Sequence, residues 1–406
     1  MTMSPCAGAV EYIPIYNLTL LGGQYFFAGS KSSLNGNAAG NVAPVVKFDE
    51  RWTLMPVYTV NYQGTKAVTD AVGSGTLFQQ MMNHRAAAVG IYTPGESSWK
   101  FKPSMSYKRE FLKETRDEAW GKGLFDYNKV GVGFEAENTY KEPFSYRLGY
   151  DFYWVNFPNF QSLESKSGVD PSGSPLGRET AGTKVLDTLN HQVSATVSRP
   201  FPYNDPKVSV TAGYSALWQT FPEQNLVNSR GQYVDHAPRT RQDFLQSASA
   251  GVAWPKAVTV FGEPSRLVSR MTTGLSYNGS NQNTFDAGRA QFVPDAYSYW
   301  SLSASPSASL SWGPEKTPSW ASASFSWSRT NYLGRLTQEA NGTYTSKHQA
   351  TDRYVASLGY GYPIAPGFSL RASANFLWAA SNQAYEATYK YTYRSANYLF
   401  GFTYDY

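Results

Sequence analysis

The chain has 406 residues, enough for one large barrel or for two or three soluble domains. Aromatic residues make up 16% of it and charged residues another 16%, whereas a typical soluble domain carries roughly 25% charged residues. The mean hydropathy is −0.43 and no apolar run approaches the ~20 residues of a membrane-spanning helix, which excludes a helical membrane protein. The net charge of +5 is not clustered, so no nucleic-acid-binding surface is indicated. A soluble β-sandwich or propeller is the alternative class.

The N-terminus contains a short processing signal. Ala7, Gly8 and Ala9 fit the small-residue pattern that precedes signal-peptide cleavage, so residues 1–9 are predicted to be the remnant of a signal peptide. The alternative is an irregular N-terminus of the mature chain. The single cysteine, Cys6, falls in this segment and excludes an internal disulfide framework.

Sixteen segments with alternating apolar and polar residues follow one another along the chain. They are residues 12–27, 41–48, 52–62, 84–93, 99–110, 129–140, 144–156, 187–199, 207–219, 244–254, 266–278, 297–312, 319–330, 352–361, 368–379 and 396–406. Short turns and longer loops connect them in strict alternation, and the longest loop is 158–184. A total of 14 or 18 strands stays open if a hairpin has been split or merged.

The segment 300–312 shows the alternation most clearly. Every odd residue from 301 to 311 is serine, while the even residues are Leu, Ala or Pro between two tryptophans. Because successive strand residues point to opposite faces, one face is apolar and the other is lined with hydroxyls. A soluble core does not explain the serine face, whereas a wall between lipid and water does. We expect a local distortion at Pro306, and a bulge or bend at Gly22-Gly23 in the first strand.

The last nine residues place aromatic side chains at 398, 400, 402, 404 and 406. This ending resembles the closing strand of Gram-negative outer-membrane β-barrels, whose assembly signal has a glycine and two aromatic residues at the positions of Gly401, Tyr404 and Tyr406; Phe400 stands where a polar residue is usual. The resemblance identifies no porin subfamily. It implies an all-β, transmembrane, antiparallel up-and-down barrel of about 16 strands, formed by residues 10–406 as a single domain, with short periplasmic turns and long extracellular loops. It also implies a place in the bacterial outer membrane, contact with lipid and lipopolysaccharide, and insertion by the barrel assembly machinery.

Aromatic residues gather at two levels, beside the short turns and about ten residues away from them. Such levels are typical of the two membrane interfaces, where amphipathic rings prefer the headgroup region. The tryptophans predicted to lie there are Trp52, Trp99, Trp154, Trp218, Trp254, Trp300, Trp312, Trp320, Trp327 and Trp378.

The face opposite the apolar one consists mostly of Ser, Thr, Gly and Asn, which are too small to fill a barrel of 16 strands. This predicts an aqueous channel for passive diffusion of small polar solutes. Basic residues on this face outnumber acidic ones, which favours anionic solutes unless the cations contact headgroups or turn carboxylates instead. The predicted pore-lining charged residues are Lys47, Lys100, Lys102, Lys108, Glu135, Glu137, Arg147, Asp151, Lys207, Arg266, Arg270, Arg353 and Arg371.

Other functions remain open at this point. A transporter of apolar compounds would need a plug from the first 40-odd residues and would leave 14 strands; a non-conducting scaffold would use its loops to bind partners. The loops 113–128 and 158–184 are long enough to narrow the lumen or to remain at the surface. We predict no enzyme, cofactor or metal site, because His191 and Ser194 fall on opposite faces and His84, His236 and His348 lack a nucleophile nearby. The sequence leaves the oligomeric state open.

Overall fold

The computed structural model describes residues 10–27, 33–69, 76–113, 118–139, 144–161, 177, 179–201, 207–260, 262–386 and 390–406. These residues form an all-β structure. Among them, no helix is long and apolar enough to cross a membrane. The strands are β1 (Glu11–Ile13), β2 (Tyr16–Phe27), β3 (Ser33–Val42), β4 (Val45–Lys47), β5 (Trp52–Thr69), β6 (Thr76–Tyr92), β7 (Trp99–Lys113), β8 (Tyr127–Thr139), β9 (Ser145–Asn156), β10 (Thr188–Phe201), β11 (Val208–Asn225), β12 (Thr240–Val260), β13 (Glu263–Ser280), β14 (Thr284–Asp286), β15 (Gln291–Val293), β16 (Tyr299–Trp312), β17 (Ser319–Gln338), β18 (Tyr344–Ala365), β19 (Phe368–Ser381) and β20 (Tyr393–Asp405).

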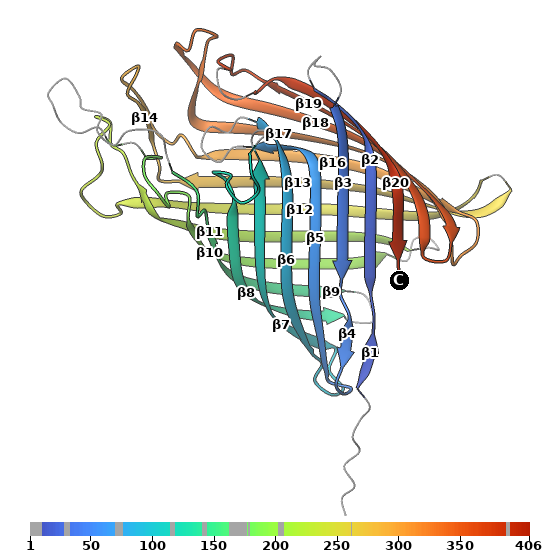
Figure 1. The fold of residues 1–406 in the computed structure, drawn as a ribbon. Helices are drawn as coiled ribbons and strands as arrows, with labels where there is room; N and C mark the ends of the chain where they lie inside the picture. Colours follow the sequence, from blue (N-terminus) through green and yellow to red (C-terminus); the bar gives the residue numbers. More distant parts are fainter. Residues whose placement is uncertain are drawn as a thin grey trace, which may run out of the picture.

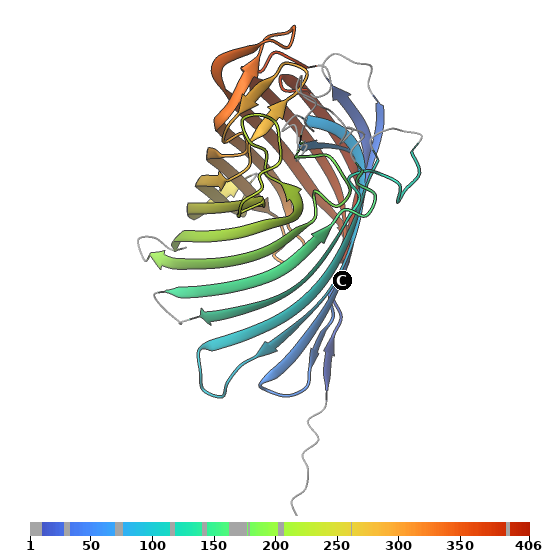
Figure 2. The same cartoon turned by 90° about the vertical axis from the view of Figure 1, so that its left-hand side faces the viewer.

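The strands close into one antiparallel barrel with 16 positions around its wall (Figure 1). β1 and β2 together count as one position, and so do β3 and β4, because each pair forms a single interrupted strand. Neighbouring positions are hydrogen-bonded to each other all the way around the wall. The hairpin β14–β15 stands outside this sheet, within the connection from β13 to β16. The long connections lie at one end of the barrel and the tight turns at the other (Figure 2). The predicted barrel and its 16 strands are confirmed.

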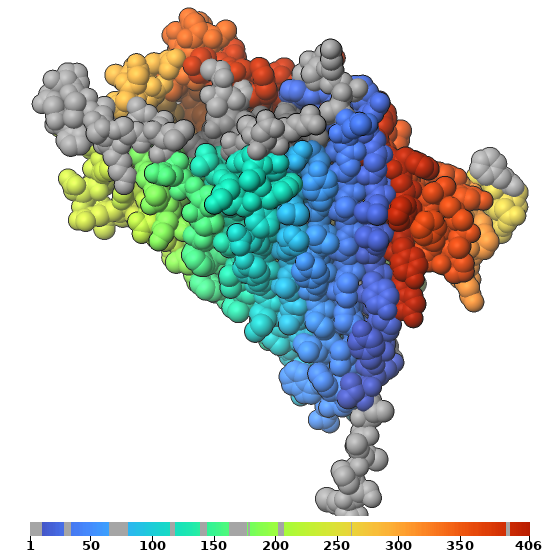
Figure 3. All heavy atoms as spheres, viewed as in Figure 1, coloured from blue at the N-terminus to red at the C-terminus, as the bar shows by residue number. Residues whose placement is uncertain are grey.

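The barrel is closed by its first and last long strands. β2 and β20 pair antiparallel from Asn17 opposite Asp405 to Phe27 opposite Ser395, and their surfaces lie side by side in Figure 3. At the short-turn end, the backbone amide of Tyr16 donates to the carbonyl of Tyr406 at 3.1 Å, and the amide of Tyr406 donates back at 2.9 Å. The two tyrosine rings stack with 4.8 Å between centroids. No strand edge is therefore left open along this seam.

The N-terminal part of the chain belongs to the wall. β2 pairs with β20 on one side and β3 on the other, so the predicted strand 12–27 belongs to the wall and the alternative of an N-terminal plug is excluded for the described residues from 10 onward. The connection between the predicted strands 12–27 and 41–48 is shorter than expected, because β3 already begins at Ser33. The two neighbouring wall positions are interrupted at Pro14 and Pro44, where proline lacks the amide hydrogen that the ladder needs.

Two expected irregularities have different outcomes. The pairing of β2 runs through Gly22 and Gly23 in unbroken register on both sides, so the predicted bulge is wrong. At Pro306 the ladder between β16 and β17 stops after Ala304 and resumes at Ser307 without a change of register. The expected distortion at this proline is therefore confirmed, and it is confined to one edge of β16.

Several strands extend far beyond the predicted segments on the long-loop side. β17 runs on to Gln338, beyond the predicted end at 330, and β18 begins at Tyr344, before the predicted start at 352, so they have 20 and 22 residues. Twenty residues at about 3.4 Å each, tilted by about 45°, rise roughly 48 Å, nearly twice the apolar band of about 25 Å. The outer halves of these strands therefore stand in water beyond the membrane, together with the connections that they carry.

The closing seam contains two glycines that have no space for a side chain, Gly23 on β2 and Gly401 on β20. A Cβ at Gly23 would overlap the backbone carbonyl oxygen of Tyr398 on β20, whereas a Cβ at its neighbour Gly22 would meet nothing within 4 Å. We expect Gly23→Ala to force β2 and β20 apart and to lower the fraction of refolded barrel several-fold, because backbone groups that lose their partners in lipid cost several kcal/mol. Heat-modifiable electrophoretic mobility would measure the folded fraction. Gly22→Ala is the matched control and should fold like the native chain; equal yields for both variants would contradict the prediction.

Candidate pore lining and outer mouth

The cross-strand register assigns every strand residue to one of two faces, because paired residues share a face. The outward face carries large apolar side chains, among them Val132, Leu148 and Leu275, which are 54%, 51% and 53% exposed. The inward face of β10–β18 repeats small hydroxyl residues, with pairs such as Ser194 opposite Ser215 and Ser309 opposite Ser322. A barrel with an apolar exterior, a polar interior and no open edge is a transmembrane barrel of the bacterial outer-membrane kind.

Nine of the ten predicted interface tryptophans share the outward face. Trp320 does not, and its prediction is wrong. It pairs with Gly361 on the same side as the serine face, where the absent side chains of Gly359 and Gly361 leave room for its ring. The guanidinium of Arg371 lies 5.0 Å from the ring centroid. Trp320 therefore binds an inward cation by a cation–π contact instead of facing lipid.

Two histidines lie on the outward face, and each is hydrogen-bonded to a tyrosine of the strand that precedes it in the chain. The Tyr58 hydroxyl is 2.8 Å from Nδ1 of His84, and the Tyr150 hydroxyl is 2.9 Å from Nδ1 of His191. Each contact gives a polar ring atom a partner on a surface that offers no water. The predicted separation of His191 from Ser194 is confirmed, since His191 pairs with outward Phe152 and Ser194 with inward Gly149.

The predicted pore-lining residues all have the inward parity, with Lys207 one residue before the start of β11. Five of them meet in one network on β7, β8 and β9. Lys102 donates to Glu135 at 2.8 Å and also to Glu137, and Arg147 lies 3.5 Å from Glu135 and 3.3 Å from Glu137. Lys100 pairs with Glu137 in the ladder and is the fifth. The two acids of this network are therefore held by cations.

The remaining predicted residues are spread around the interior. Lys47 forms an exposed ion pair with Glu11 at 2.8 Å, near the short-turn end. Arg266 and Arg270 project from β13, pairing with the serines at 311 and 307 of β16. Arg353 lies opposite Ser328 and Ala379. The serine-lined wall thus holds cations at separate positions, while the wall of β6–β9 holds most of the charged groups.

Two inward cations on that charged wall are not among the predicted pore-lining residues. Arg85 on β6 and Lys129 on β8 both pair with Lys108 of β7, one on each side. Lys108 in turn donates to Glu110 at 2.6 Å and to the Tyr127 hydroxyl at 2.7 Å. Both missed residues follow the same alternation as their neighbours, so parity along the strand could have found them; both stand near the outer ends of the predicted segments.

These residues surround a hollow of about 540 Å³ in the charged wall. Its lining comes from β5 to β10 and includes Thr59, Asn83, Arg85, Lys108, Lys129, Asp151, Tyr153 and Gln192. In the described part of the chain, no group of His, Cys, Asp and Glu side chains has an arrangement that could hold a metal ion. The chemistry that the hollow offers is therefore hydrogen bonding and charge.

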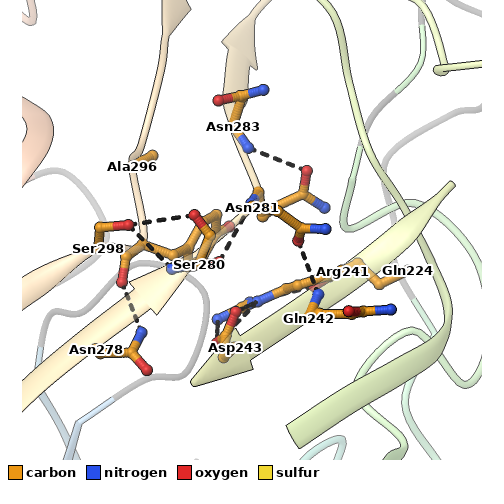
Figure 4. Close-up of polar contacts among 12 residues, drawn as sticks. Gln224, Arg241, Gln242, Asp243, Asn278, Ser280, Asn281, Asn283, Ala296 and Ser298 are labelled. Atoms are coloured by element: carbon orange, nitrogen blue, oxygen red, sulfur yellow. Dashed lines mark hydrogen bonds and ion pairs between the residues drawn. The ribbon is translucent and has the colours of Figure 1, made fainter. Parts of the chain in front are cut away.

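At the outer end of the barrel, polar residues of β11, β12 and β13 and of the connection from β13 to β16 form a cluster (Figure 4). Its centre is Arg241, which donates to both oxygens of Asp243 at 2.9 and 3.1 Å and to Gln224 at 3.2 Å. The guanidinium lies between the rings of Phe221 and Tyr297, at 4.2 and 4.0 Å from their centroids. Burial raises the pKa of Tyr297 to about 12. We call this group, residues 221–243 and 278–298, the outer-mouth cluster.

Hydrogen bonds join the outer-mouth cluster into one piece. Asn278 donates to the carbonyl of Tyr297 at 3.0 Å, and Ser280 and Ser298 exchange two bonds at 3.1 and 3.2 Å. Thr284 of β14, in the connection from β13 to β16, donates to Glu179 of the connection from β9 to β10 at 2.8 Å. Side-chain amides thus satisfy backbone groups that no strand partner reaches, and they hold the long connections against one another.

The charged loop before β8 lies on the outside of the wall. Trp120 packs edge-on against outward Tyr62 with 6.2 Å between ring centroids, and a side chain at Gly121 would touch outward Phe111. Of the two alternatives for the loop 113–128, Trp120 and Gly121 therefore take the surface position, whereas Tyr127 at the start of β8 faces inward beside Lys108. Most of the loop 158–184, namely 162–176 and 178, lies outside the described residues, so its role stays a prediction.

No family model matches the chain, and no curated protein matches it by sequence. Among solved structures, outer-membrane expressed OmpT of Vibrio cholerae is similar with 11% identity and a TM-score of 0.43, covering 100% of this chain and 99% of that one. Salmonella typhi OmpF in complex with daunomycin has 12% identity and a TM-score of 0.43 over 100% of both chains. A mutant of Rh. blastica porin has 11% identity and a TM-score of 0.34, covering 98% of this chain and 100% of that one.

The outer-mouth cluster should depend on its buried ion pair. Arg241 and Asp243 side chains are 9% and 6% exposed, so Asp243→Asn leaves a buried guanidinium without its counter-charge, which costs about 3–5 kcal/mol. We expect this variant to expose the long connections to limited proteolysis in the folded protein, while the barrel itself keeps its heat-modifiable mobility. Glu11→Gln is the control, because its pair with Lys47 lies at the short-turn end with the two side chains 57% and 45% exposed, and contributes about 0–1 kcal/mol. Unchanged proteolysis of the Asp243 variant would contradict this account.

Proposed function

We propose that this barrel is a passive diffusion channel for small polar solutes that prefers anions. The observation that supports it best is the distribution of ion pairs on the inward face. Glu135, Glu137 and Glu110 are each held by a neighbouring cation. In the described part of the chain, no ion pair holds Arg85, Lys129, Arg266 or Arg270, and these cations remain available to a passing solute.

The wall supports diffusion more than tight binding. Small hydroxyl and glycine residues line β10–β18 and leave the interior wide, as in barrels of this size that hold an aqueous channel. Hydroxyl groups replace part of a solute's hydration without fixing its orientation. A non-conducting scaffold is the competing function, and the rigid outer-mouth cluster is the feature that favours it.

The proposal predicts the sign of ion selectivity. In a planar bilayer under a salt gradient, the refolded protein should give steady openings with a reversal potential on the anion side. The double variant Arg266→Gln with Arg270→Gln should lower the anion-to-cation permeability ratio by about two- to five-fold, because a unit charge a few ångströms from an ion in water changes its energy by about 1 kcal/mol before screening. The control is Lys256→Gln, which removes an outward lysine and should leave the ratio unchanged.

Two outcomes would count against the channel. Cation selectivity of the native protein would overturn the anion preference and leave a pore. No conductance from protein that is shown to be folded would overturn the pore itself and support a scaffold.

We also propose that lipid and lipopolysaccharide cover the exterior and that the barrel assembly machinery recognises Gly401, Tyr404 and Tyr406. Tyr404 and Tyr406 support this, since they are outward and 40% and 62% exposed at the end of the closing strand. We expect Tyr406→Ala to lower the amount of folded barrel in cells several-fold while leaving refolding in detergent nearly unchanged. The matched control is Tyr362→Ala, which removes another outward tyrosine, 51% exposed, away from the terminus. Equal losses in cells and in detergent would show a folding defect instead of lost recognition.

A further inference from the structure

Three cations lie in one row across the charged wall. Arg85 of β6 is directly opposite Lys108 of β7, and Lys108 is directly opposite Lys129 of β8. All three have the inward parity, so their side chains project side by side into the lumen. Directly opposed residues have Cβ atoms only about 4.5–5.5 Å apart, and like charges in this arrangement destabilise a sheet.

Two other rows of the same wall, three and four inward positions away along β7, avoid this cost. Lys102 is opposite Glu135, and Lys100 is opposite Glu137, which is itself opposite Arg147. Opposite charges are therefore adjacent in both of those rows. The row of Arg85, Lys108 and Lys129 departs from this pattern.

The protein compensates only part of the charge in this row. Glu110 accepts from Lys108 at 2.6 Å, and the Tyr153 ring receives the Lys129 ammonium at 3.4 Å from its centroid. The second acid is Asp151, which also lines the hollow. Three cations and two acids leave a net charge of +1, and within the described residues Arg85 and Lys129 have no ion-pair partner.

The hollow beside the row has the size and the donors for a small anion. Its volume is about 540 Å³, and Asn83, Gln192 and Thr59 add neutral hydrogen-bonding groups around the cations. Its floor includes Gly131 and Gly133, which keep the wall thin at this point. A guanidinium presents two parallel N–H groups to an oxyanion, and each ammonium adds further donors with full charge.

We propose that this row is a binding site for a phosphate group, either free or carried by a small solute. A divalent anion between Arg85, Lys108 and Lys129 would replace their mutual repulsion with attraction to each of them. The site rests on the proposed channel function, because a solute reaches it through the lumen. It makes the row a point where phosphate-bearing solutes pause during passage.

The test is calorimetric titration of inorganic phosphate and of glycerol 3-phosphate into the folded protein in detergent, at low ionic strength. We expect saturable binding by the native protein. Arg85→Gln and Lys129→Gln should each weaken it at least ten-fold, and both variants should keep their folded electrophoretic mobility because they relieve repulsion. Arg270→Gln, which removes an inward cation outside the row, should keep the affinity within about two-fold and so separates a site from a general field.

Each result decides something. Loss of affinity that is equal in all three variants, or no saturable binding by the native protein, would overturn the site. Binding of both ligands would indicate a phosphate group carried by a solute, and binding of inorganic phosphate alone would indicate the free ion. Calorimetry needs no conduction, so a folded protein that binds phosphate without conducting would overturn the proposed channel and keep the phosphate site. Conduction without phosphate binding would overturn the site and keep the channel.

Discussion

The structure depends on the pairing of β2 with β20, because a membrane barrel has no other way to satisfy its edges. Every backbone group within the hydrocarbon must find a partner in the wall, and a single unpaired edge would leave a row of them exposed to lipid. The reciprocal bonds between Tyr16 and Tyr406 place the start of β2 at the end of β20. Closure in turn sets which residues are opposite one another around the whole circumference, since each strand inherits its register from the previous one.

Closure also explains why a single alternation in the sequence can produce two different surfaces. With the register set, one parity faces acyl chains and the other faces water, and a residue has no intermediate position. Trp320 shows how strict this rule is. Its ring takes the inward side because its place in the ladder requires it, and Gly359 and Gly361 provide the space. The aromatic character that suggests a lipid interface is used there to hold Arg371.

Much of the barrel could be predicted from the sequence, because the constraint of lipid repeats in every strand. The serines of β16 and the aromatic residues of β20 identify both faces without any tertiary information. β3 escaped prediction because glycine and asparagine, which dominate it, are depleted in ordinary strands. The outer halves of β17 and β18 escaped because they stand beyond the membrane, where nothing demands an apolar face. The outer-mouth cluster could not be predicted at all, since Arg241 lies on β12 while Tyr297 and Glu179 come from two separate connections.

The charged wall shows the limit of parity most clearly. Parity along a strand predicts that Lys108 faces inward, but it cannot say which residues of β6 and β8 stand beside it; that depends on the register. Once the register is known, the charges of the rows can be compared, and the two rows that pair opposite charges differ from the row of Arg85, Lys108 and Lys129, which has a single sign. In the row of Lys100, Glu137 and Arg147 an acid stands in the middle, and a wall selected for stability alone would place one in the middle of the cationic row as well. An acid close to that row, Glu110, sits one inward position further along β7, where it holds Lys108 and accepts from the Tyr127 hydroxyl. The cost of the row is therefore only partly relieved within the described part of the wall, and an anion in the lumen is a partner whose charge would relieve the rest.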